Sequence, residues 1–460
     1  MKRKSLVLVV IGYLLAFALG GCSLGDNEGL PTQTPSASPG NPQPTEAAAM
    51  WTRTFGGKGT DVLNSVALAP GGGFFAAGYT TSVEGDFVAR HGDDNSDGVV
   101  ARFASDGSLV WAKVLGGSDA DIFTSVAVCD DGSIVVVGST YSFDGDFPAQ
   151  RGSDGSDAVV VRLSFDGSVV WAKSFGGSDA DEFEAVTAVT GGAVVAVGDT
   201  MSTDGDFPVA HGEGACNAVA AKVSADGALV WAKTYGGTGV DGFNAVTLVS
   251  GENVIAAGHA FSSDGDFPVK HTGSADAVIV RLSAEGNVTW AKTFGGDGED
   301  SLFAVTLASD DGVIGGGVLG STDGPFYKTL MTHFTLDGVV TWTKSFGGGA
   351  TDRIMGLTTT SDGQILAVGD ASSSNGDFPV AKGHRSDALI FEVSADGVLN
   401  WAKTYGGSGD DFFSAAVILP DGDIVAVGDT DSNGGDFSPT RGDSDALVAQ
   451  LTSDGELGPS

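Results

Sequence analysis

Aspartates recur at one position of this 460-residue sequence and suggest cation chemistry. Each follows a repeated Trp-[Ala/Thr]-[Lys/Arg]-x-[Phe/Tyr/Leu]-Gly-Gly segment by a few residues: Asp61, Asp121, Asp181, Asp241, Asp300, Asp352 and Asp411. If the repeats close into a ring, carboxylates at the mouth of its channel could gather Ca²⁺ or another cation. Each carboxylate could instead accept hydrogen bonds from backbone N–H groups of its own loop. Because every repeat carries the aspartate, we favour this structural role and keep the cation site as the alternative.

Histidine, arginine and lysine alternate at a second repeated position. It lies four residues after the phenylalanine of a Gly-Asp-Phe segment and holds His91, Arg151, His211, His271, Lys382 and Arg441. Histidine would suit metal binding or acid–base catalysis, but arginine and lysine do not ligate metals under ordinary conditions. We therefore predict an ion pair with a loop carboxylate at this position. We expect each phenylalanine to fill a gap between adjacent repeats.

One of these loops gathers several acidic side chains. Asp144 and Asp146, with Asp154 and Asp157, place many oxygens in one loop, and oxygen is the ligand atom that Ca²⁺ prefers. Their spacing matches no EF-hand loop, and turns and strand starts explain most of them. Ca²⁺ is therefore a candidate ligand, and no cofactor is otherwise predicted.

The fifth repeat departs from the others. Its long loop lacks the Gly-Asp-Phe-Pro and Ser-Asp-Ala segments and carries Pro325-Phe326-Tyr327-Lys328 instead. The shorter loop predicts a notch in the rim of the molecule. A notch lined by Phe326, Tyr327 and Lys328 could receive a peptide or a glycan. Simple drift of one repeat is the alternative explanation.

The N-terminus predicts export and lipid attachment. A basic start and the apolar run 5–21 lead to Leu-Gly-Gly-Cys22, which resembles the bacterial lipobox. Under that resemblance residues 1–21 are a signal peptide and Cys22 carries the lipid. An ordinary signal peptide or a membrane anchor is the alternative. Residues 22–49 alternate proline with serine and threonine, which indicates an extended tether.

These residues must be positioned by a fold made of strands. The tryptophan segments begin at Trp51, Trp111, Trp171, Trp231, Trp290, Trp342 and Trp401, in steps of 60, 60, 60, 59, 52 and 59 residues. Within one step the sequence predicts strands at 123–129, 133–140, 157–164 and 168–175, with Asp-Gly turns. Residues 134–137 are apolar in succession, so both faces of the sheet must be buried. Four-stranded units sandwiched between copies of themselves describe the blades of a β-propeller.

Counting strands predicts how the ring closes. The last repeat ends without a tryptophan strand, while a spare one, Met50 to Phe55, stands at the front. We therefore predict an all-β, seven-bladed propeller of four-stranded blades over residues 50–460, in which Met50 to Phe55 completes blade seven. Joining the two ends of the chain in one sheet hides the edges that an open array would expose.

The repeat resembles a known bacterial family. Its segments read Trp-Ala-Lys-x-Phe-Gly-Gly, Asp-x-Phe-x-x-Val, Asp-Gly-x-Ile-Val-x-Val-Gly-x-Thr, Gly-Asp-Phe-Pro and Ser-Asp-Ala-x-Val-x-[Arg/Lys]-Leu-Ser-x-Asp-Gly. This series is similar to the bacterial seven-bladed β-propeller repeat family, often called SBBP, over essentially all of 51–456. The resemblance implies an extracytoplasmic, often surface-attached protein and no common enzymatic activity. A weaker likeness to eight-bladed quinoprotein-like propellers conflicts with the seven repeats and with Gly-Asp-Phe-Pro.

Charge and loop length narrow the function. The chain has 23 basic and 59 acidic residues and a net charge of −36, so its surface repels nucleic acid and anionic lipid headgroups. The long loops all fall on one face of a propeller, where we expect any ligand to bind. Cys129 and Cys216 lie at unlike places in their repeats, so no disulfide is predicted.

The sequence favours a binding function over catalysis. We expect a monomeric, non-catalytic binding or scaffold module for an envelope or surface protein or a polysaccharide, held outside the cytoplasm by the lipid on Cys22. The alternatives are an extracellular polysaccharide hydrolase or lyase and an envelope assembly factor. Catalysis needs a few unlike residues that converge once, whereas these loops repeat near-identical sets. No catalytic residue is therefore predicted.

Overall fold

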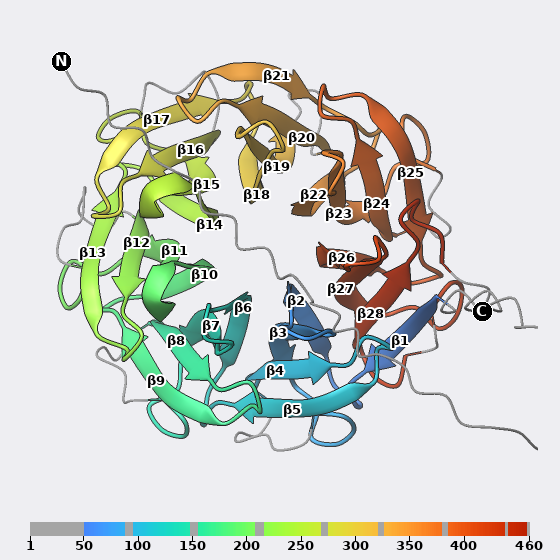
Figure 1. Ribbon diagram of the computed structural model, residues 1–460, viewed down its shortest axis with the longest axis horizontal. Coiled ribbons are helices and arrows are strands. Elements are labelled where there is room, and N and C mark those ends of the chain that lie inside the picture. The colour runs from blue at the N-terminus through green and yellow to red at the C-terminus, as the bar shows by residue number, and fades with distance from the viewer. Residues whose placement is uncertain are drawn as a thin grey trace, which may run out of the picture. The chain divides into compact units, whose positions relative to one another are not determined.

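The computed structural model describes residues 50–87, 95–147, 155–207, 216–267, 275–320, 326–379, 385–437 and 440–457. Apart from two short 3₁₀ turns, η1 (Thr190–Gly192) and η2 (Ser250–Glu252), the regular structure of these residues is all β-strand. The strands form seven antiparallel four-stranded sheets, arranged as blades around a central axis (Figure 1). The all-β, seven-bladed propeller predicted from the sequence is confirmed.

Each blade runs from an innermost strand at the axis to an outermost strand at the rim (Figure 1). The innermost strands are β2 (Asp61–Leu68), β6 (Asp121–Val128), β10 (Asp181–Ala188), β14 (Asp241–Leu248), β18 (Ser301–Leu307), β22 (Asp352–Thr359) and β26 (Asp411–Ile418). The second strands are β3 (Phe74–Thr80), β7 (Ile134–Thr140), β11 (Val194–Thr200), β15 (Val254–Ala260), β19 (Val313–Gly320), β23 (Ile365–Ala371) and β27 (Ile424–Thr430).

The two outer positions of each blade follow the same order. The third strands are β4 (Asp97–Phe103), β8 (Asp157–Leu163), β12 (Asn217–Val223), β16 (Asp276–Leu282), β20 (Tyr327–Phe334), β24 (Asp387–Val393) and β28 (Asp445–Leu451). The outermost strands are β5 (Leu109–Leu115), β9 (Val169–Phe175), β13 (Leu229–Tyr235), β17 (Val288–Phe294), β21 (Val340–Lys344), β25 (Leu399–Tyr405) and β1 (Trp51–Phe55). Consecutive blades are numbered one to seven from β2 onwards.

Successive apolar residues of a strand serve two different cores. In β7, Ile134 and Val136 belong to the core shared with blade one, and Val135 and Val137 to the core shared with blade three. Adjacent side chains of a strand point to opposite faces of the sheet. The continuous apolar runs in the sequence therefore report burial on both faces of a blade.

The phenylalanine of each Gly-Asp-Phe segment fills the core between its own blade and the preceding blade. These residues are Phe87, Phe147, Phe207, Phe267, Phe378 and Phe437, and all are buried. The expected role of this phenylalanine is confirmed. We call it the plug.

Tryptophans and Asp-Gly turns interlock neighbouring blades. Gly167 has a φ of +83°, and a Cβ atom there would lie 3.0 Å from the ring of Trp111 in the preceding blade. Only glycine meets both conditions without strain. In the next pair, Trp171 also donates its indole N–H to the carbonyl of Ala225 at 3.0 Å. The repeated Trp and Asp-Gly elements thus hold blades together at the rim.

The N-terminal strand closes the ring. β1 pairs with β28 in antiparallel register from Trp51↔Gln450 to Phe55↔Ala446, and the sheet continues through β27 to the innermost β26 (Figure 1). The predicted completion of blade seven is confirmed. Residues 49–460 form one compact unit. All seven sheets lie within 51–451, so the propeller core is built from this part of the chain. The described residues contain no helix that is long and apolar enough to cross a membrane.

Candidate functional site

The seven repeated aspartates are buried hydrogen-bond acceptors. In blade two, Asp121 Oδ2 accepts from the N–H of Gly117 at 2.8 Å and from the hydroxyl of Ser142 at 2.9 Å. Its Oδ1 accepts from the hydroxyl of Thr140. In all blades Oδ2 accepts from the N–H of the second glycine of the repeated pair. The predicted bonds to backbone N–H groups are confirmed, and side-chain hydroxyls add to them.

The aspartates Asp61, Asp121, Asp181, Asp241, Asp300, Asp352 and Asp411 are all fully buried. Burial raises the pKa of Asp121 to about 6, and that of Asp181 likewise, against the opposing effect of the Thr and Ser hydroxyls and the glycine N–H. Among the described residues, no group of three or more His, Cys, Asp or Glu side chains could hold a metal ion. A cation role for the ring of aspartates stays a prediction.

The acidic loop of blade two is also tied to the backbone. Asp144 Oδ1 accepts from the N–H of Ser118 at 2.8 Å, and Asp146 Oδ2 accepts from that of Gly116 at 3.1 Å. Both bonds hold the long loop against the glycine pair. Asp154 lies outside the described residues, so calcium binding by this loop stays a prediction.

One member of the repeated basic position lies within the described residues. Arg441 Nη2 lies 3.0 Å from Asp86 Oδ2 in blade one and donates to the carbonyl of Thr54 at 2.6 Å. The predicted ion pair with a loop carboxylate is confirmed for Arg441. Outside the described residues are His91, Arg151, His211, His271 and Lys382, together with Cys22. Cys129 and Cys216 are free thiols, as expected.

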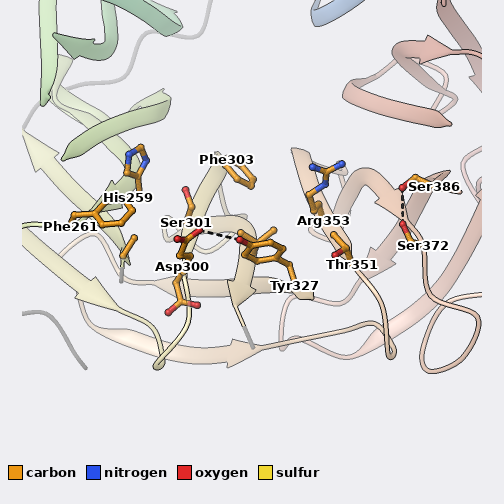
Figure 2. A pocket seen from close by; sticks show the side chains of 13 residues that line it. His259, Phe261, Asp300, Ser301, Phe303, Tyr327, Thr351, Arg353, Ser372 and Ser386 are labelled. Atoms are coloured by element: carbon orange, nitrogen blue, oxygen red, sulfur yellow. Dashed lines mark hydrogen bonds between the residues drawn. The ribbon is translucent and has the colours of Figure 1, made fainter. Parts of the chain in front are cut away.

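A cavity of about 620 Å³ lies at blade five, on the face of the long loops. It is lined by His259, Phe261, Ala275, Glu299, Asp300, Ser301, Phe303, Val318, Tyr327, Thr351, Arg353, Ser372 and Ser386. Blade four contributes His259 and Phe261 on one side, blade six contributes Thr351 and Arg353 on the other, and Tyr327 lies between them (Figure 2). We call this cavity the blade-five pocket.

The pocket lies at the blade whose connection between the second and third strands is the shortest. The connection between the second and third strands spans 141–156 in blade two but only 321–326 in blade five. Of the predicted notch residues, Tyr327 lines the pocket, whereas the exposed Phe326 and Lys328 do not. The predicted notch therefore coincides with a cavity, but one residue of the three contributes to its lining.

Hydrogen bonds fix the polar side chains of the pocket. The hydroxyl of Tyr327 donates to Glu299 Oε2 at 3.1 Å. Arg353 makes a two-point pair with the buried Asp370, with Nε–Oδ1 at 2.8 Å and Nη2–Oδ2 at 3.2 Å. The hydroxyls of Ser372 and Ser386 lie 2.7 Å apart (Figure 2). Such held side chains can orient a polar ligand with little loss of side-chain entropy.

Burial shifts the pKa values of two titratable groups of the pocket. It lowers the pKa of His259, which favours the neutral imidazole. It raises the pKa of Tyr327, helped by the neighbouring carboxylate of Glu299, so the phenol stays protonated. The pocket therefore presents a neutral imidazole, a phenol and a guanidinium that is already paired. Together with Phe261 and Phe303, these groups suit a ligand that has both apolar and hydrogen-bonding surfaces.

Sequence reasoning missed His259 and Arg353, because both lie on strands rather than in the long loops. His259 pairs with Gly242, and Arg353 with Asp370, at one equivalent register position of two blades. At the position of His259 the other blades carry Tyr79, Ser139, Asp199, Val318, Asp370 and Asp429. A position that varies while its neighbours repeat is the signal that could have found them.

The channel between the innermost strands holds an unusual glutamate. Each of these strands has a β-bulge, and the bulged residues line a cavity of about 290 Å³. Asn64 donates to the carbonyl of Phe123 in the next blade at 2.9 Å, and Thr124 donates to that of Phe183 at 2.7 Å. Glu184 occupies this position in blade three. A carboxylate has no proton to donate, so ionised Glu184 cannot make the equivalent bond.

Replacing this glutamate is expected to stabilise the protein above neutral pH. Burial, and then the charges of Asp199 and Glu182, raise the pKa of Glu184 from 4.5 to about 7. Protonation therefore favours the folded state, and this stabilisation is complete below pH 4.5 and lost as the pH rises to 7. Glu184→Gln is neutral and can donate, so we expect it to be more stable than the wild type by roughly 2 kcal/mol at pH 8.

Urea unfolding of both chains across this pH range measures the effect. The gain in stability of Glu184→Gln should shrink as the pH falls from 7 to 4.5. Acids that do not interact with Glu184 titrate alike in both chains, so their contributions cancel in the difference. An equal difference at every pH would contradict the assignment to Glu184.

No family model matches the chain. The regulatory protein FlaEY of Caulobacter vibrioides is 24% identical over 425 residues, which is 87% of this chain, and the chain spans 40% of the length of that protein. Among solved structures, BamB from Moraxella catarrhalis aligns over 84% of this chain and 96% of its own, with 12% identity and a TM-score of 0.39. The polysaccharide lyase Uly1 aligns over 85% and 90%, with 9% identity and a TM-score of 0.45.

Proposed function

We propose that this protein is a non-catalytic binding or scaffold module that receives a protein or polysaccharide on its long-loop face, in the blade-five pocket. One observation carries the proposal: unlike polar and aromatic side chains from three blades meet there in a single cavity of about 620 Å³. Pockets of this size, with an apolar lining and a few fixed polar groups, are the usual form of a ligand site. The repeated aspartates that the structure describes are occupied instead in holding the loops.

The chemistry of the pocket suits a segment of a polymer. Phe261, Phe303 and Tyr327 offer aromatic surface to a sugar ring or an apolar side chain. Ser301 and Thr351 offer hydroxyls that can both donate and accept hydrogen bonds. Because Arg353 is paired with Asp370, it adds little net charge to the pocket. A neutral or weakly charged segment therefore fits better than a strongly anionic one, which the net charge of −36 would also repel.

The proposal places the protein outside the cytoplasm of a bacterium, as a lipoprotein of the SBBP family. Residues 1–21 are the signal, Cys22 carries the lipid, and 22–49 tether a monomeric propeller to the membrane. The lipobox pattern and the repeat segments support this placement. The partner is then a protein or polysaccharide of the envelope or cell surface, and an envelope assembly factor is one form that such a module can take.

A hydrolase or lyase is the second candidate, and one observation favours it. His259, Tyr327 and Arg353 line one cavity, so unlike residues do converge once in this molecule. The sequence disfavoured catalysis because the loops repeat near-identical residues, and this objection does not apply to the pocket. Against an enzyme stand the bonds already made: Tyr327 donates to Glu299, and Arg353 is paired with Asp370. Release of shorter polysaccharide chains by the purified protein, abolished by Tyr327→Ala, would establish the enzyme instead.

Capture of a partner from the native envelope tests the binding proposal. Chain 50–460 and its Tyr327→Ala variant are used as bait, with Ca²⁺ and with a chelator. We expect one specific partner with the wild type and recovery at least about tenfold lower with Tyr327→Ala, because the variant loses an aromatic face and a hydroxyl. Lys328→Ala is the matched control, since Lys328 is exposed beside the pocket but does not line it. Equal recovery by Tyr327→Ala and the wild type would refute a role for the pocket.

A further inference from the structure

The plug of each ordinary blade is held by three contacts that its own loop supplies. In blade two, Asp146 accepts from the N–H of Gly116 at 3.1 Å through Oδ2, and its backbone N–H donates to the carbonyl of Gly116 at 2.9 Å. The ring of Phe147 packs on that of Phe123 at 6.3 Å. The same carboxylate-to-glycine bond occurs in six blades. An aspartate followed by a phenylalanine is therefore what this surface binds.

Blade five keeps this surface partly exposed at the phenylalanine and the two glycines, whereas Leu302 beneath them is fully buried. We define the plug seat of blade five by Phe294, Gly295, Gly296 and Leu302, the equivalents of the residues beneath the plug in other blades. The core between blades four and five contains no loop phenylalanine among the described residues. Phe294 and Gly295 are partly exposed, whereas the matching residues of the other six blades are buried.

The two glycines of the seat lack the neighbours that the plug loop gives them in other blades. No described residue accepts a hydrogen bond from the N–H of Gly295, which in other blades the aspartate does. A Cβ atom on Gly296 would meet no described atom within 4 Å. A Cβ atom on the equivalent Gly237 of blade four would lie 2.2 Å from a carboxylate oxygen of Asp264.

The sequence of blade five lacks, at the equivalent position, the aspartate that makes these contacts in the other blades. In blade five Gly324-Pro325-Phe326 stands where the other loops carry Gly-Asp-Phe, with Pro325 at the position of the aspartate. Proline has neither a carboxylate nor a backbone N–H, so it can make neither bond to Gly295. Because β20 begins at Tyr327, Phe326 directly precedes the strand, and its side chain is 48% exposed rather than buried as a plug.

We propose that the plug seat of blade five binds an aspartate–phenylalanine segment of a partner polypeptide. The aspartate carboxylate of the partner accepts from the N–H of Gly295, its backbone N–H donates to the carbonyl of Gly295, and the phenylalanine ring packs against the exposed part of Phe294. The two hydrogen bonds are those that six blades make with their own loops. The proposal goes beyond the blade-five pocket, because neither Phe294 nor the two glycines line that pocket.

A peptide copied from blade two is the probe. A fluorescently labelled peptide of residues 142–149, Ser-Phe-Asp-Gly-Asp-Phe-Pro-Ala, is titrated with chain 50–460 and followed by anisotropy. We expect saturable binding that falls at least about tenfold when the peptide carries Phe147→Ala, from loss of buried aromatic area. The Asp146→Pro peptide, which imitates blade five, should also bind at least about tenfold more weakly. Equal binding of all three peptides, or none, would overturn the proposal.

Variants of Gly296 locate the binding. Gly296→Trp should abolish peptide binding by filling the seat, and Gly296→Leu serves the same purpose if the larger side chain prevents folding. Gly296→Ala should melt like the wild type, whereas Gly237→Ala should melt at a lower temperature because its Cβ meets Asp264. Tyr327→Ala should bind the peptide normally, which separates this site from the pocket.

Other occupants of the seat give different results. If the chain's own residues fill it, Gly296→Ala will destabilise the protein as Gly237→Ala does. If a second copy fills it, chain 50–460 will elute as a dimer, and Gly296→Trp will elute as a monomer. Either result, or peptide binding that survives Gly296→Trp, would overturn the assignment to a partner polypeptide.

Discussion

Removal of residues 50–56 is expected to lower the melting temperature of the whole propeller by roughly 10 °C or to prevent folding. The deletion takes away β1, which supplies the fourth strand of blade seven. Phe55 leaves the core between blades seven and one, where it packs on Phe103 at 5.0 Å, and the half-buried Trp51 no longer packs against that core. Losing a large aromatic side chain from a core typically costs about 3–5 kcal/mol, and losing a half-buried one costs less.

The effect should spread beyond blade seven. Without β1, the strand β28 becomes an exposed edge whose backbone N–H and C=O groups have no partner on one side. The ring then depends on the remaining contacts of blade seven with its neighbours. We expect aggregation to accompany the loss of stability.

Two chains that differ only at this strand make the comparison. Chain 50–460 lacks the N-terminal segment but keeps β1, and chain 57–460 lacks both. Calorimetry or circular dichroism should show a cooperative transition for the first chain and a lower or absent transition for the second. Equal melting of the two chains would refute closure by the N-terminal strand.

The architecture could be predicted because each blade repeats the same local problem. An Asp-Gly turn (Glu-Gly in blade four), the apolar runs and the tryptophan strand recur in every step, so one correct interpretation of a repeat was copied around the ring. The spare strand Met50 to Phe55 then left one arrangement in which no sheet edge stays open. A repeated residue such as Gly167 was thus informative about the fold. Gly167 packs against Trp111 of the preceding blade, and the equivalent turns of other blades need a glycine for the same reason.

The pocket could not be predicted for the opposite reason. His259 and Arg353 are 94 residues apart and lie at positions that differ from blade to blade, so no local pattern connects them. They line one cavity only because the ring places blades four, five and six side by side (Figure 1). The sequence did locate the neighbourhood, since the shortened loop before Tyr327 marked blade five as different. It could not show which side chains from the adjacent blades complete the site.

The hydrogen-bond donors to the repeated aspartates could be predicted only in part from residue spacing. Their backbone donors were predicted from the loop that follows the glycine pair. Their hydroxyl donors were missed, although Thr140 and Ser142 stand 19 and 21 residues after Asp121 and recur in other blades. Those hydroxyls lie across the sheet, because Asp121 pairs with Thr140 in the strand register. Contacts of that kind require knowledge of the register and not only of the loop.

Truncation of one buried aspartate is expected to be the most costly single substitution. Asp121→Ala leaves the N–H of Gly117 and the hydroxyls of Thr140 and Ser142 without their shared acceptor. Hydrogen bonds to charged groups contribute about 1.5–3 kcal/mol each, and these donors stay buried when the carboxylate is removed. The contributions are not additive, so we expect a loss of about 3–5 kcal/mol in the free energy of unfolding.

Urea unfolding with and without Ca²⁺ measures this loss and distinguishes the two roles of the aspartate ring. Asp119→Ala is the matched control, because Asp119 lies in the same loop but is exposed, and it should change stability by less than about 0.5 kcal/mol. A loss for Asp121→Ala that is equal in Ca²⁺ and in chelator follows from protein donors alone. A loss that appears only with Ca²⁺ would instead show that the carboxylate binds the cation, because an ion that binds the folded state stabilises it by mass action.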